Sequence, residues 1–299
     1  MLAMTEPKND FPLIRKDILV RKVKIYGKVE TLSPLKVGKG GGETNPLSPA
    51  TMQIIRTYGG KPLIPGSSWK GVFRSTGEKI AKVKGVYTCT GLSKQTCMDR
   101  TLKNYKNRKV LEIFQDYLAS NNISEAIKLV WDYTCINCKI FGGPSIYSAV
   151  TILDSIAEKF KIGYRAMIAV NRKTGATSAL AKVEYVEPGS IFPFTLIGNN
   201  LPNYALGYII KIMRYINEGM IQVGGNKSRG FGFVKFNNLT LEVSDYSGGK
   251  LKALDEIDKE VKIELPKNEK AEDFFDKTKE LEGCFDEVKI PFPKNTVHS

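Results

Sequence analysis

A strand-to-helix corner is encoded by the stretch Ile64-Pro65-Gly66-Ser67-Ser68-Trp69-Lys70-Gly71-Val72-Phe73-Arg74. Pro65 and Gly66 end the short apolar run before them, and the pattern after them predicts a long helix. Ser67 or Ser68 is expected to cap this helix by accepting a hydrogen bond from one of its unpaired amides. The corner therefore marks where a strand of the core gives way to the first helix.

The start of this helix is predicted to bind an anion. Unpaired amides and the positive end of the helix dipole favour a phosphate there without dedicated chemistry. Lys70 and Arg74 are four residues apart, so a helix places both on one face. The alternative is an ordinary capped helix with a solvated basic face, which the stretch on its own does not exclude. The rest of the chain favours the phosphate site.

The charge of the chain favours a polyanionic partner. The 299 residues include 45 Lys and Arg against 31 Asp and Glu, a net charge of +14. Residues 251–299 carry nine Lys and thirteen acidic residues, a net of −4, which leaves +18 on residues 1–250. A field of this size attracts nucleic acid and makes binding depend on salt. A membrane surface fits less well, because the basic residues are scattered and form no amphipathic basic helix.

Length and apolar content give the expected compartment. A chain of 299 residues can bury a core of its own, as one large domain or two ordinary ones. No apolar run is long enough to span a bilayer, and residues 1–8 lack the apolar segment of a secretory signal. We therefore expect a soluble, cytoplasmic protein with no membrane partner.

Hydrophobic periodicity predicts an α+β fold. Strands are expected at residues 20–32, 148–154, 190–197 and 230–243, and helices at 67–84 and 204–217. In chain order these elements read strand, helix, strand, strand, helix, strand. That order is the ferredoxin-like (RRM-like) arrangement, which also underlies common RNA-binding modules.

A lobe is predicted to be inserted into this palm, which as a whole occupies residues 1–244. The pattern of the palm breaks at residues 86–139, where four cysteines bracket two helical stretches near 103–118 and 124–133. We expect these residues to form a small helical lobe beside the sheet.

Two further segments are expected outside the core of the palm. Residues 160–187 predict a thumb-like β-hairpin whose tip carries the cations Arg172 and Lys173. Residues 245–299 predict an acidic extension with helices around 252–261 and 271–281. We expect the extension to pack against the body or to be partly ordered.

Two glycine-rich loops carry cations and are predicted to lie together. The first, residues 37–43, contains Lys39, and the second, residues 224–232, contains Lys227, Ser228 and Arg229. The ferredoxin-like order brings their strands into one sheet, so the loops can approach each other, and the missing side chains let a ligand backbone come close. Each loop alone is as readily a flexible turn. The first lacks the Lys-Ser/Thr ending of a nucleotide-binding loop, so we infer no nucleotide hydrolysis.

Four of the five cysteines have the spacing of a metal site. Cys89 and Cys97 are separated by seven residues, and Cys135 and Cys138 form a C-x-x-C pair. Tetrahedral thiolate sites need four soft ligands, so this set predicts one structural zinc ion. Two disulfides or a redox pair are the competing interpretations, and a reducing cytoplasm disfavours the disulfides. Cys284 is left over as a free thiol.

The order of these motifs resembles the CRISPR-associated RAMP superfamily, and within it the repeated backbone subunit of type III (Csm/Cmr) effector complexes. The resemblance rests on the corner at 64–74, on Ile140-Phe141-Gly142-Gly143 and on the late loop at 224–232, within roughly residues 20–243. It implies an RRM-like palm, a zinc-bearing lobe, a projecting thumb hairpin and a filament of subunits that holds guide RNA. The implied partners are crRNA, target RNA and the other subunits of the complex.

Ten residues are predicted to contact RNA. They lie in the two cationic loops, in the corner and at the hairpin tip, and the family resemblance supports the choice. They are Lys39, Ser67, Ser68, Lys70, Arg74, Arg172, Lys173, Lys227, Ser228 and Arg229. The predicted function is a guide-RNA-binding backbone subunit of a type III interference complex in antiviral defence. A general RRM-like binder of single-stranded RNA outside CRISPR systems is a further alternative.

One departure from the family pattern argues against cleavage of RNA. Cleaving members carry an aspartate between the first glycine loop and the corner, whereas residues 43–56 contain Glu43 as their one carboxylate. The one histidine, His298, lies at the end of the chain, so a histidine general base is not expected. We therefore assign no catalytic residue. Glu43 and Asp154 are the candidates if the alternative, a metal-dependent endoribonuclease, applies.

Overall fold

The computed structural model describes residues 11–38, 50–246 and 248–294. Its elements form a mixed α+β fold with antiparallel sheets, as the sequence predicts. Within these described ranges no helix combines the length and the apolar character needed to cross a lipid bilayer. Lys39, Glu43 and His298 lie outside the described residues.

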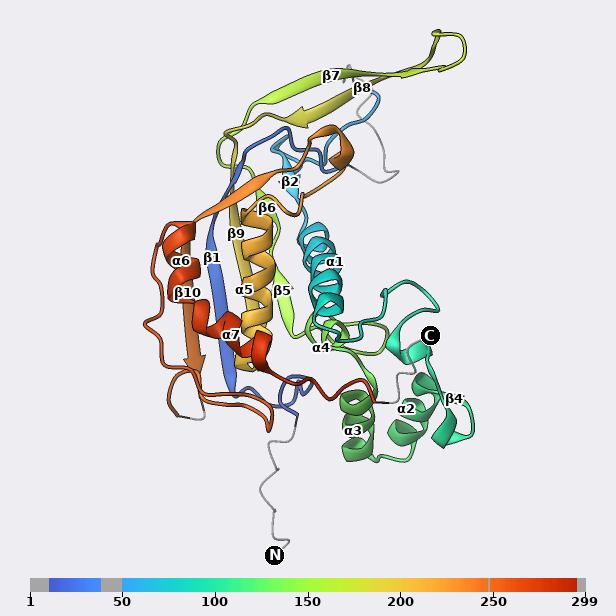
Figure 1. Ribbon diagram of the computed structural model, residues 1–299, viewed down its shortest axis with the longest axis vertical. Helices are drawn as coiled ribbons and strands as arrows, with labels where there is room; N and C mark the ends of the chain where they lie inside the picture. The colour runs from blue at the N-terminus through green and yellow to red at the C-terminus, as the bar shows by residue number, and fades with distance from the viewer. Residues whose placement is uncertain (1–10, 39–49, 247, 295–299) are drawn as a thin grey trace, which may run out of the picture.

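A four-stranded antiparallel sheet forms the centre of the molecule (Figure 1). The strand order is β10-β1-β9-β5, made from β1 (Arg21–Thr31), β5 (Val150–Ile152), β9 (Ile191–Asn199) and β10 (Val234–Asp245). In the central strand β1, Val23, Ile25 and Val29 are buried, while the lysines beside them face the other side. One face of the sheet is therefore apolar and needs a cover.

Two helices, α1 (Gly66–Val83) and α5 (Asn203–Asn217), cover the apolar face (Figure 1). Trp69 and Phe73 of α1 pack on Phe194 of β9, with ring centroids 5.4 and 6.0 Å apart. All three side chains are fully buried, and each such burial contributes about 1.5–3 kcal/mol. The central elements follow the predicted order of strand, helix, strand, strand, helix, strand.

The corner that precedes α1 is held by a segment far away in the sequence. Strand β2 (Leu63–Ile64) pairs with β6 (Ser155–Ile156), which places Asp154 beside the start of the helix. The Oδ1 atom of Asp154 accepts a hydrogen bond of 2.8 Å from the backbone N–H of Gly66. The carboxylate therefore occupies one of the free donors of α1.

The prediction that Ser67 or Ser68 caps α1 is wrong. The N-cap residue is Pro65, and no side chain of the corner caps the helix there. A capping side chain must come from the residue just before the first helical residue, and Ser67 and Ser68 fall inside the first turn. Asp154 supplies the acceptor instead.

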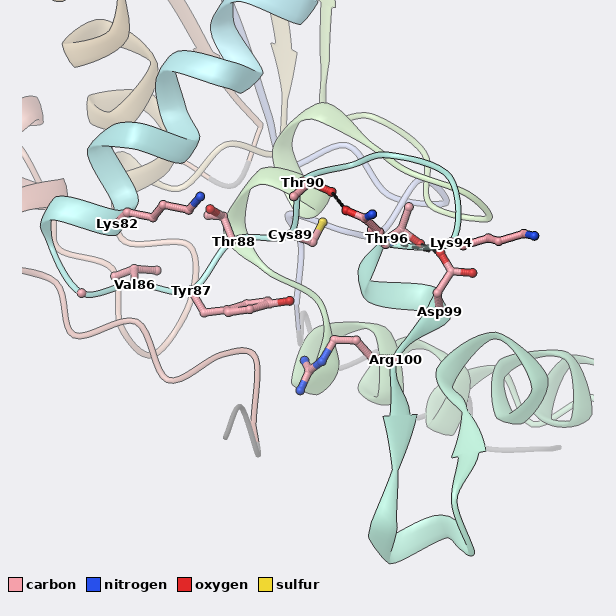
Figure 2. A pocket seen from close by; sticks show the side chains of 12 residues that line it. Lys82, Val86, Tyr87, Thr88, Cys89, Thr90, Lys94, Thr96, Asp99 and Arg100 are labelled. Carbon is pink, nitrogen blue, oxygen red and sulfur yellow. Dashed lines mark hydrogen bonds between the residues drawn. The ribbon is translucent and has the colours of Figure 1, made fainter. Parts of the chain in front are cut away.

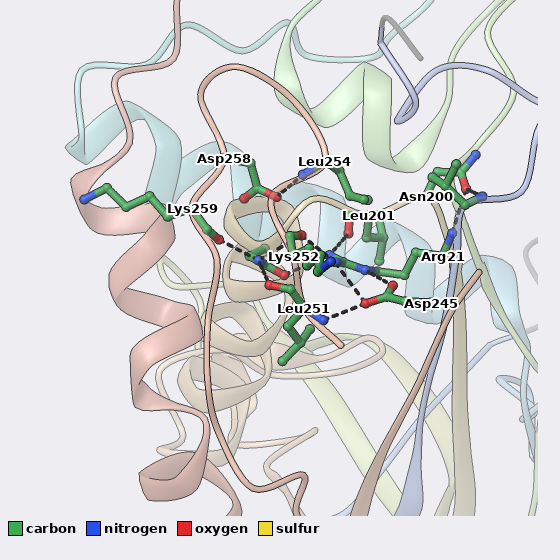
Figure 3. A network of polar contacts seen from close by, with 11 residues as sticks. Arg21, Asn200, Leu201, Asp245, Leu251, Lys252, Leu254, Asp258 and Lys259 are labelled. Carbon is green, nitrogen blue, oxygen red and sulfur yellow. Dashed lines mark hydrogen bonds and ion pairs between the residues drawn. The ribbon is translucent and has the colours of Figure 1, made fainter. Parts of the chain in front are cut away.

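A buried arginine joins β1 to β10 and to the chain that follows it (Figure 3). Arg21 has no exposed surface and forms an ion pair with Asp245. Its guanidinium also donates to the side chain of Asn203 at 2.8 Å and to the carbonyl of Lys252 at 2.6 Å. A buried charge is tolerated only where its donors are paired, so this network fixes residue 252 against the start of α5.

Residues 86–139, which we call the lobe, contain two short 3₁₀ helices, a short hairpin and three α-helices, the last of which continues to Phe141. The elements are η1 (Cys97–Asp99), β3 (Thr101–Leu102), η2 (Lys103–Tyr105), β4 (Arg108–Lys109), α2 (Val110–Ala119), α3 (Ile123–Tyr133) and α4 (Ile136–Phe141). The helix expected from residue 103 begins at Val110, because Lys106 and Asn107 adopt φ values of 54° and 57° that turn the chain into the β3–β4 hairpin. The lobe has its own cluster of buried apolar side chains.

The predicted hairpin is formed by β7 (Ile162–Val170) and β8 (Thr177–Val186) and projects from one end of the molecule (Figure 1). Its base is fixed to the palm, because Leu35 and Val186 exchange backbone hydrogen bonds of 2.9 and 2.8 Å. The buried carboxylate of Glu184 accepts a further bond of 3.0 Å from the backbone of Ile54. The hairpin is therefore anchored at its base and extends outward to its tip.

The C-terminal extension packs on α5 through α6 (Ala271–Lys277) and α7 (Lys279–Glu287). The ring centroids of Tyr208 and Phe285 lie 4.5 Å apart, and Arg214 pairs with Glu282 at 2.7 Å. A Cβ atom on Gly207 would lie 1.8 Å from a carbonyl oxygen of α7, so only glycine allows this approach. The extension is thus part of the folded body.

The prediction of a helix at residues 252–261 is wrong, because this segment has no regular secondary structure. The backbone N–H of Val261 donates to the carbonyl of Leu251 at 3.0 Å and closes a loop. Asp255 and Asp258 accept from backbone amides of the same loop at 3.1 and 2.9 Å. Aspartate side chains that bind nearby amides compete with helical hydrogen bonding, which explains the loop.

Candidate nucleic-acid interface and metal site

The second glycine-rich loop, residues 224–232, is hydrogen-bonded to the residues that lead into the first loop. Val37 and Gly38, the described residues of that first loop, line the same groove as Gly224 and Gly225. The backbone N–H of Gly225 donates to the carbonyl of Lys36 at 2.8 Å, and that of Gly232 donates to the carbonyl of Pro34 at 2.9 Å. Gly224 has a φ of +82°, and a Cβ atom there would lie 2.3 Å from the carbonyl oxygen of Lys36. The contact therefore depends on glycine at residue 224.

A groove of about 340 Å³ lies between these loops and helix α1, and we call it the loop groove. Its lining residues are Val37, Gly38, Ser68, Gly71, Val72, Ser75, Gly224, Gly225 and Lys227. Among the described residues, no atom outside the helix lies within 4 Å of a Cβ built on Gly71, so these residues leave this side of α1 uncovered. The groove brings Ser68 of the corner together with Lys227 of the late loop, two of the predicted RNA contacts.

Lysines surround the loop groove and its side of the palm without acidic partners. Lys16, Lys36, Lys70, Lys79 and Lys227 make no ion pair to any described residue. Burial lowers the pKa of Lys36, and burial together with the nearby charge of Lys79 lowers the pKa of Lys227. Cations that repel one another and lack partners are stabilised by a polyanion.

Lys70 and Arg74 start from one face of α1 but have different surroundings. Burial, followed by the charge of Arg74, lowers the pKa of Lys70. Burial, followed by the charge of Lys70, lowers the pKa of Lys16 in the same way. The Arg74 guanidinium instead donates to the carbonyl of Gly142 at 2.6 Å. Gly91 lies against it, since a Cβ on that glycine would be 2.6 Å from Nε of Arg74. Lys70 is thus the member of the pair that remains beside the open surface.

The remaining predicted RNA contacts lie at separate places. Ser228 and Arg229 form the short helix η3 (Lys227–Arg229), and Nη1 of Arg229 lies 3.1 Å from the sulfur of Met167 in the hairpin. Arg172 and Lys173 are exposed at the hairpin tip, at the far end from the palm (Figure 1). Ser67 is exposed on the first turn of α1. Lys39 cannot be placed, because it lies outside the described residues.

The four predicted cysteine ligands converge in the lobe. The Sγ atoms of Cys89, Cys97, Cys135 and Cys138 all lie within 4.8 Å of one another, and all four residues are buried. The sulfurs of Cys89 and Cys138 are 3.3 Å apart and those of Cys135 and Cys89 are 3.9 Å apart, too far for disulfide bonds of about 2.05 Å. A metal with bonds of about 2.3 Å to four sulfurs places them about 3.8 Å apart, which this cluster approaches. The cluster can therefore hold a tetrahedral metal ion.

The electrostatics of this cluster divide its four thiols into two pairs. Contacts with the neighbouring thiols, first of all Cys135, raise the pKa of Cys97 far above its ordinary value, and burial raises the pKa of Cys135. Hydrogen bonds from neighbouring thiols, first of all Cys135, hold the pKa of Cys89 well below its ordinary value, and the Cys135 contact likewise lowers the pKa of Cys138 to about 7. Arg74 lies 3.5 Å from the Cys89 sulfur and 3.4 Å from that of Cys138. Burial opposes the charge of Arg74, but the adjacent thiolates of Cys138, Cys89 and Cys135 raise its pKa. Arg74 thus offsets the negative charge of the cluster.

Asp154 is the one catalytic candidate among the described residues, and its carboxylate is already in use. It accepts from the backbone of Gly66, and the next residue, Ser155, is buried and accepts from the indole of Trp69 at 2.9 Å. Among the described residues, Asp154 does not belong to any cluster of side chains that could hold a metal ion. The other candidate, Glu43, lies outside those residues.

Sequence reasoning missed Lys16, Lys36 and Lys79, which belong to the basic surface. Lys79 had a usable signal, because it continues the helical spacing of Ser68 and Ser75 along α1. Lys36 stands directly before the first glycine loop. Lys16 had no signal in the sequence, since only the fold brings it close to Lys70.

Two comparisons with known proteins each found a similarity. The family model of the RAMP superfamily matches residues 28–235. The CRISPR system Cms endoribonuclease Csm3 of Enterococcus italicus is 44% identical over 55 residues, which are 18% of this chain and 25% of that relative. The match thus spans about a quarter of the length of that curated relative.

Proposed function

Since this chain belongs to the RAMP superfamily, we propose that it is a guide-RNA (crRNA)-binding backbone subunit of a type III CRISPR interference complex. The observation that carries the proposal is the loop groove, where the late glycine-rich loop is hydrogen-bonded to Pro34 and Lys36, just before the first such loop, beside α1. The partial similarity to Csm3 supports the choice of complex. Its partners would be crRNA, target RNA and sibling subunits.

The groove suits the sugar-phosphate backbone of single-stranded RNA. Gly71 and Gly225 leave room for a backbone to approach, and Ser68 offers a hydroxyl group to a phosphate oxygen. Lys227 and Lys70 supply positive charge that no described acid neutralises. Contacts of this kind position RNA without reading its sequence, as a subunit that holds any guide requires.

We propose that the palm, residues 1–244, is ferredoxin-like. The order β10-β1-β9-β5 and the two helices on one face support this assignment. Residues 86–139 would be its inserted lobe, 160–187 its thumb and 245–299 an appended extension. The basic hairpin tip would then reach a neighbouring subunit or the target strand.

We assign the cysteine cluster to one structural zinc ion in a reducing, cytoplasmic setting. Four thiolates and no open coordination position suit a structural ion, which contributes directly to folding of the lobe. The residues that would hold it are Cys89, Cys97, Cys135 and Cys138. Less than half an equivalent of zinc in protein purified without chelators would contradict this assignment.

The RNA-binding proposal is tested with purified protein and single-stranded RNA at rising salt. The logarithm of affinity should fall linearly with the logarithm of salt, with a slope of about −0.7 for each phosphate contact. Lys227→Ala should reduce the slope by about 0.7, whereas Lys267→Ala, an exposed lysine of the extension, should not change it. Binding that is absent at low salt, or independent of salt, contradicts the proposal.

Native purification followed by sequencing of bound RNA separates this role from a general RNA binder. Guide RNA and sibling subunits should copurify with the wild-type protein. Recovery of unrelated cellular RNA without such subunits would favour the general RRM-like alternative.

A metal-dependent endoribonuclease is the second candidate, because the Csm3 relative carries that name. Hydrolysis of this kind needs carboxylates that hold a divalent ion, and Asp154 is occupied as a helix cap. We therefore expect no cleavage when the protein, alone and in its complex, is incubated with labelled complementary RNA and Mg²⁺ or Mn²⁺. Cleavage that disappears in Glu43→Ala or Asp154→Ala would make the nuclease the better assignment.

A further inference from the structure

A second basic cavity, of about 550 Å³, opens in the lobe beyond the C-terminal end of α1, and we call it the lobe pocket (Figure 2). Its lining includes Lys82, Tyr87, Thr88, Lys94, Thr96 and Arg100. Asp99 is the acidic residue of the lining, and its carboxylate is used internally, since it accepts from the backbone and the hydroxyl group of Thr96 at 3.0 and 2.6 Å. Three cations thus face this pocket against one acid that is already bonded.

The hydroxyl group of Thr88 gives independent evidence for a ligand. Thr88 is 5% exposed, and its Oγ1 atom has no hydrogen-bond partner in the described part of the chain. Leaving such a group unpaired costs about 1–3 kcal/mol, which a bound acceptor would recover. In Figure 2 the Lys82 side chain extends from the end of α1 toward Thr88, so a cation and a free donor serve the same part of the pocket.

The exposed face of α1 connects the lobe pocket to the loop groove. Ser68 and Ser75 line the loop groove and Lys82 lines the lobe pocket, with Lys79 between them on the same helical stripe. Lys79 is close enough to Lys227 for its charge to lower the pKa of that lysine. The helix from Ser68 to Lys82 rises by about 1.5 Å at each of its fourteen residue steps and so spans about 21 Å. A single extended strand of RNA can therefore follow α1 from one site to the other.

We propose that the lobe pocket binds a backbone phosphate of the same single-stranded RNA that occupies the loop groove, an inference that rests on the proposed function. Lys82 supplies the charge, and Thr88 donates its hydroxyl proton to a phosphate oxygen, whereas the Lys94 side chain extends away from Thr88 in Figure 2. Arg100 has other partners, as it donates to the carbonyl of Tyr133 at 3.4 Å and lies over the ring of Tyr87, so it shapes the pocket wall. The thiolate of Cys89, which also lines the pocket, opposes an anion, and Arg74 offsets its charge.

The test compares salt-dependent RNA binding by five forms of the full chain. Lys82→Ala should reduce the salt slope of the wild type by about 0.7, and Lys128→Ala, an exposed lysine on α3 outside the pocket, should leave it unchanged. Thr88→Val should weaken binding about tenfold without lowering the melting temperature, because it removes a hydroxyl group that is unpaired in the absence of RNA. Lys227→Ala reports on the loop groove separately.

The outcomes distinguish the two proposals. Wild-type slope and affinity in both Lys82→Ala and Thr88→Val, with a reduced slope in Lys227→Ala, overturn the lobe pocket and leave the loop groove intact. Thr88→Val that lowers the melting temperature and leaves RNA affinity unchanged also overturns it, since the hydroxyl group then serves only the fold. A wild-type protein that does not bind RNA overturns the proposed function itself, and the pocket with it.

Discussion

The Oδ1 atom of Asp154 lies 2.8 Å from the backbone nitrogen of Gly66, so a carboxylate from the strand β5–β6 region caps helix α1. A carboxylate at a helix N-terminus offsets the positive end of the dipole. One amide of the anion site expected at this helix start is thus already bonded to a carboxylate of the protein. The RNA site that we propose lies further along the helix, in the loop groove, whose lining includes Ser68 and Lys227.

Removal of this cap should destabilise the protein. Asp154→Ala should lower the free energy of unfolding by about 1–2 kcal/mol, because the Gly66 amide loses its acceptor. Asp154→Asn should lower it less, since an amide oxygen still accepts the bond. Chemical denaturation measures both, and Ser67→Ala serves as the control, with a change within about 0.5 kcal/mol. Equal stability of wild type and Asp154→Ala would show that the cap contributes nothing.

The contact between the glycine loops should not tolerate a side chain at residue 224. Gly224→Ala places a Cβ atom 2.3 Å from the carbonyl oxygen of Lys36 at a φ of +82°, so the loops must separate. We expect a loss of about 1–3 kcal/mol in stability and weaker RNA binding. Gly189→Ala is the matched control, because Gly189 lies outside the loop groove, has a similar φ of +78°, and a Cβ there would meet no described atom within 4 Å. RNA binding that is the same in both variants would show that loop closure is irrelevant to the site.

Arg74 should matter to the metal site more than to RNA. Its guanidinium touches the sulfurs of Cys89 and Cys138, so replacement by Met removes the charge that favours their thiolates. The thiols then titrate at higher pH, and the pH at which half the bound metal is released should rise by about one unit. Metal release monitored with a chromogenic chelator across pH measures this shift.

The RNA affinity of the same variant provides the contrast. Arg74→Met should keep the salt slope of the wild type, whereas Lys70→Ala should reduce it by about 0.7. A reduced slope in Arg74→Met with unchanged metal release would reverse this assignment and restore Arg74 as a phosphate contact.

Much of the fold was predictable because its signals are local. Alternation along β1 and the apolar spacing of α5 identify the core elements, and glycine loops at corresponding ends of two paired strands predict their meeting. The C-x-x-C spacing of Cys135 and Cys138 predicted a metal site, and Cys89 and Cys97 were assigned to it because they are cysteines. The pairing of β2 with β6 has no local signal, since each strand contributes two residues, and the Asp154 cap depends on it.

The fate of Arg74 and of residues 252–261 depended on neighbours far away in sequence. Helical spacing correctly put Lys70 and Arg74 on one face, but the cysteine cluster attracts only the second of them. Residues 252–261 have adequate helical composition, yet Asp255 and Asp258 turn their carboxylates to local amides and to α5. In each case a polar contact across the fold decides between two locally acceptable conformations.

The Asp255 carboxyl group should make the stability of the protein depend on pH. Burial, with the neighbouring charge of Asp258, raises its pKa to about 6, although its hydrogen bond from Tyr204 opposes the shift. An ordinary value of 3.8 applies in the unfolded chain, so the folded chain binds more protons between pH 4 and 6. The free energy of unfolding therefore falls as pH rises through this window, by at most about 3 kcal/mol from this group.

Asp255→Asn should remove this contribution, because an amide does not ionise. Relative to the variant, the wild type should lose stability between about pH 4 and pH 7, as measured by urea denaturation at several pH values. Glu256→Gln, an exposed neighbour in the same loop, should follow the wild-type profile. Parallel profiles for wild type and Asp255→Asn would mean that the carboxylate is as well solvated in the folded protein as in the unfolded chain, and that the extension is not held closely against α5 at this residue.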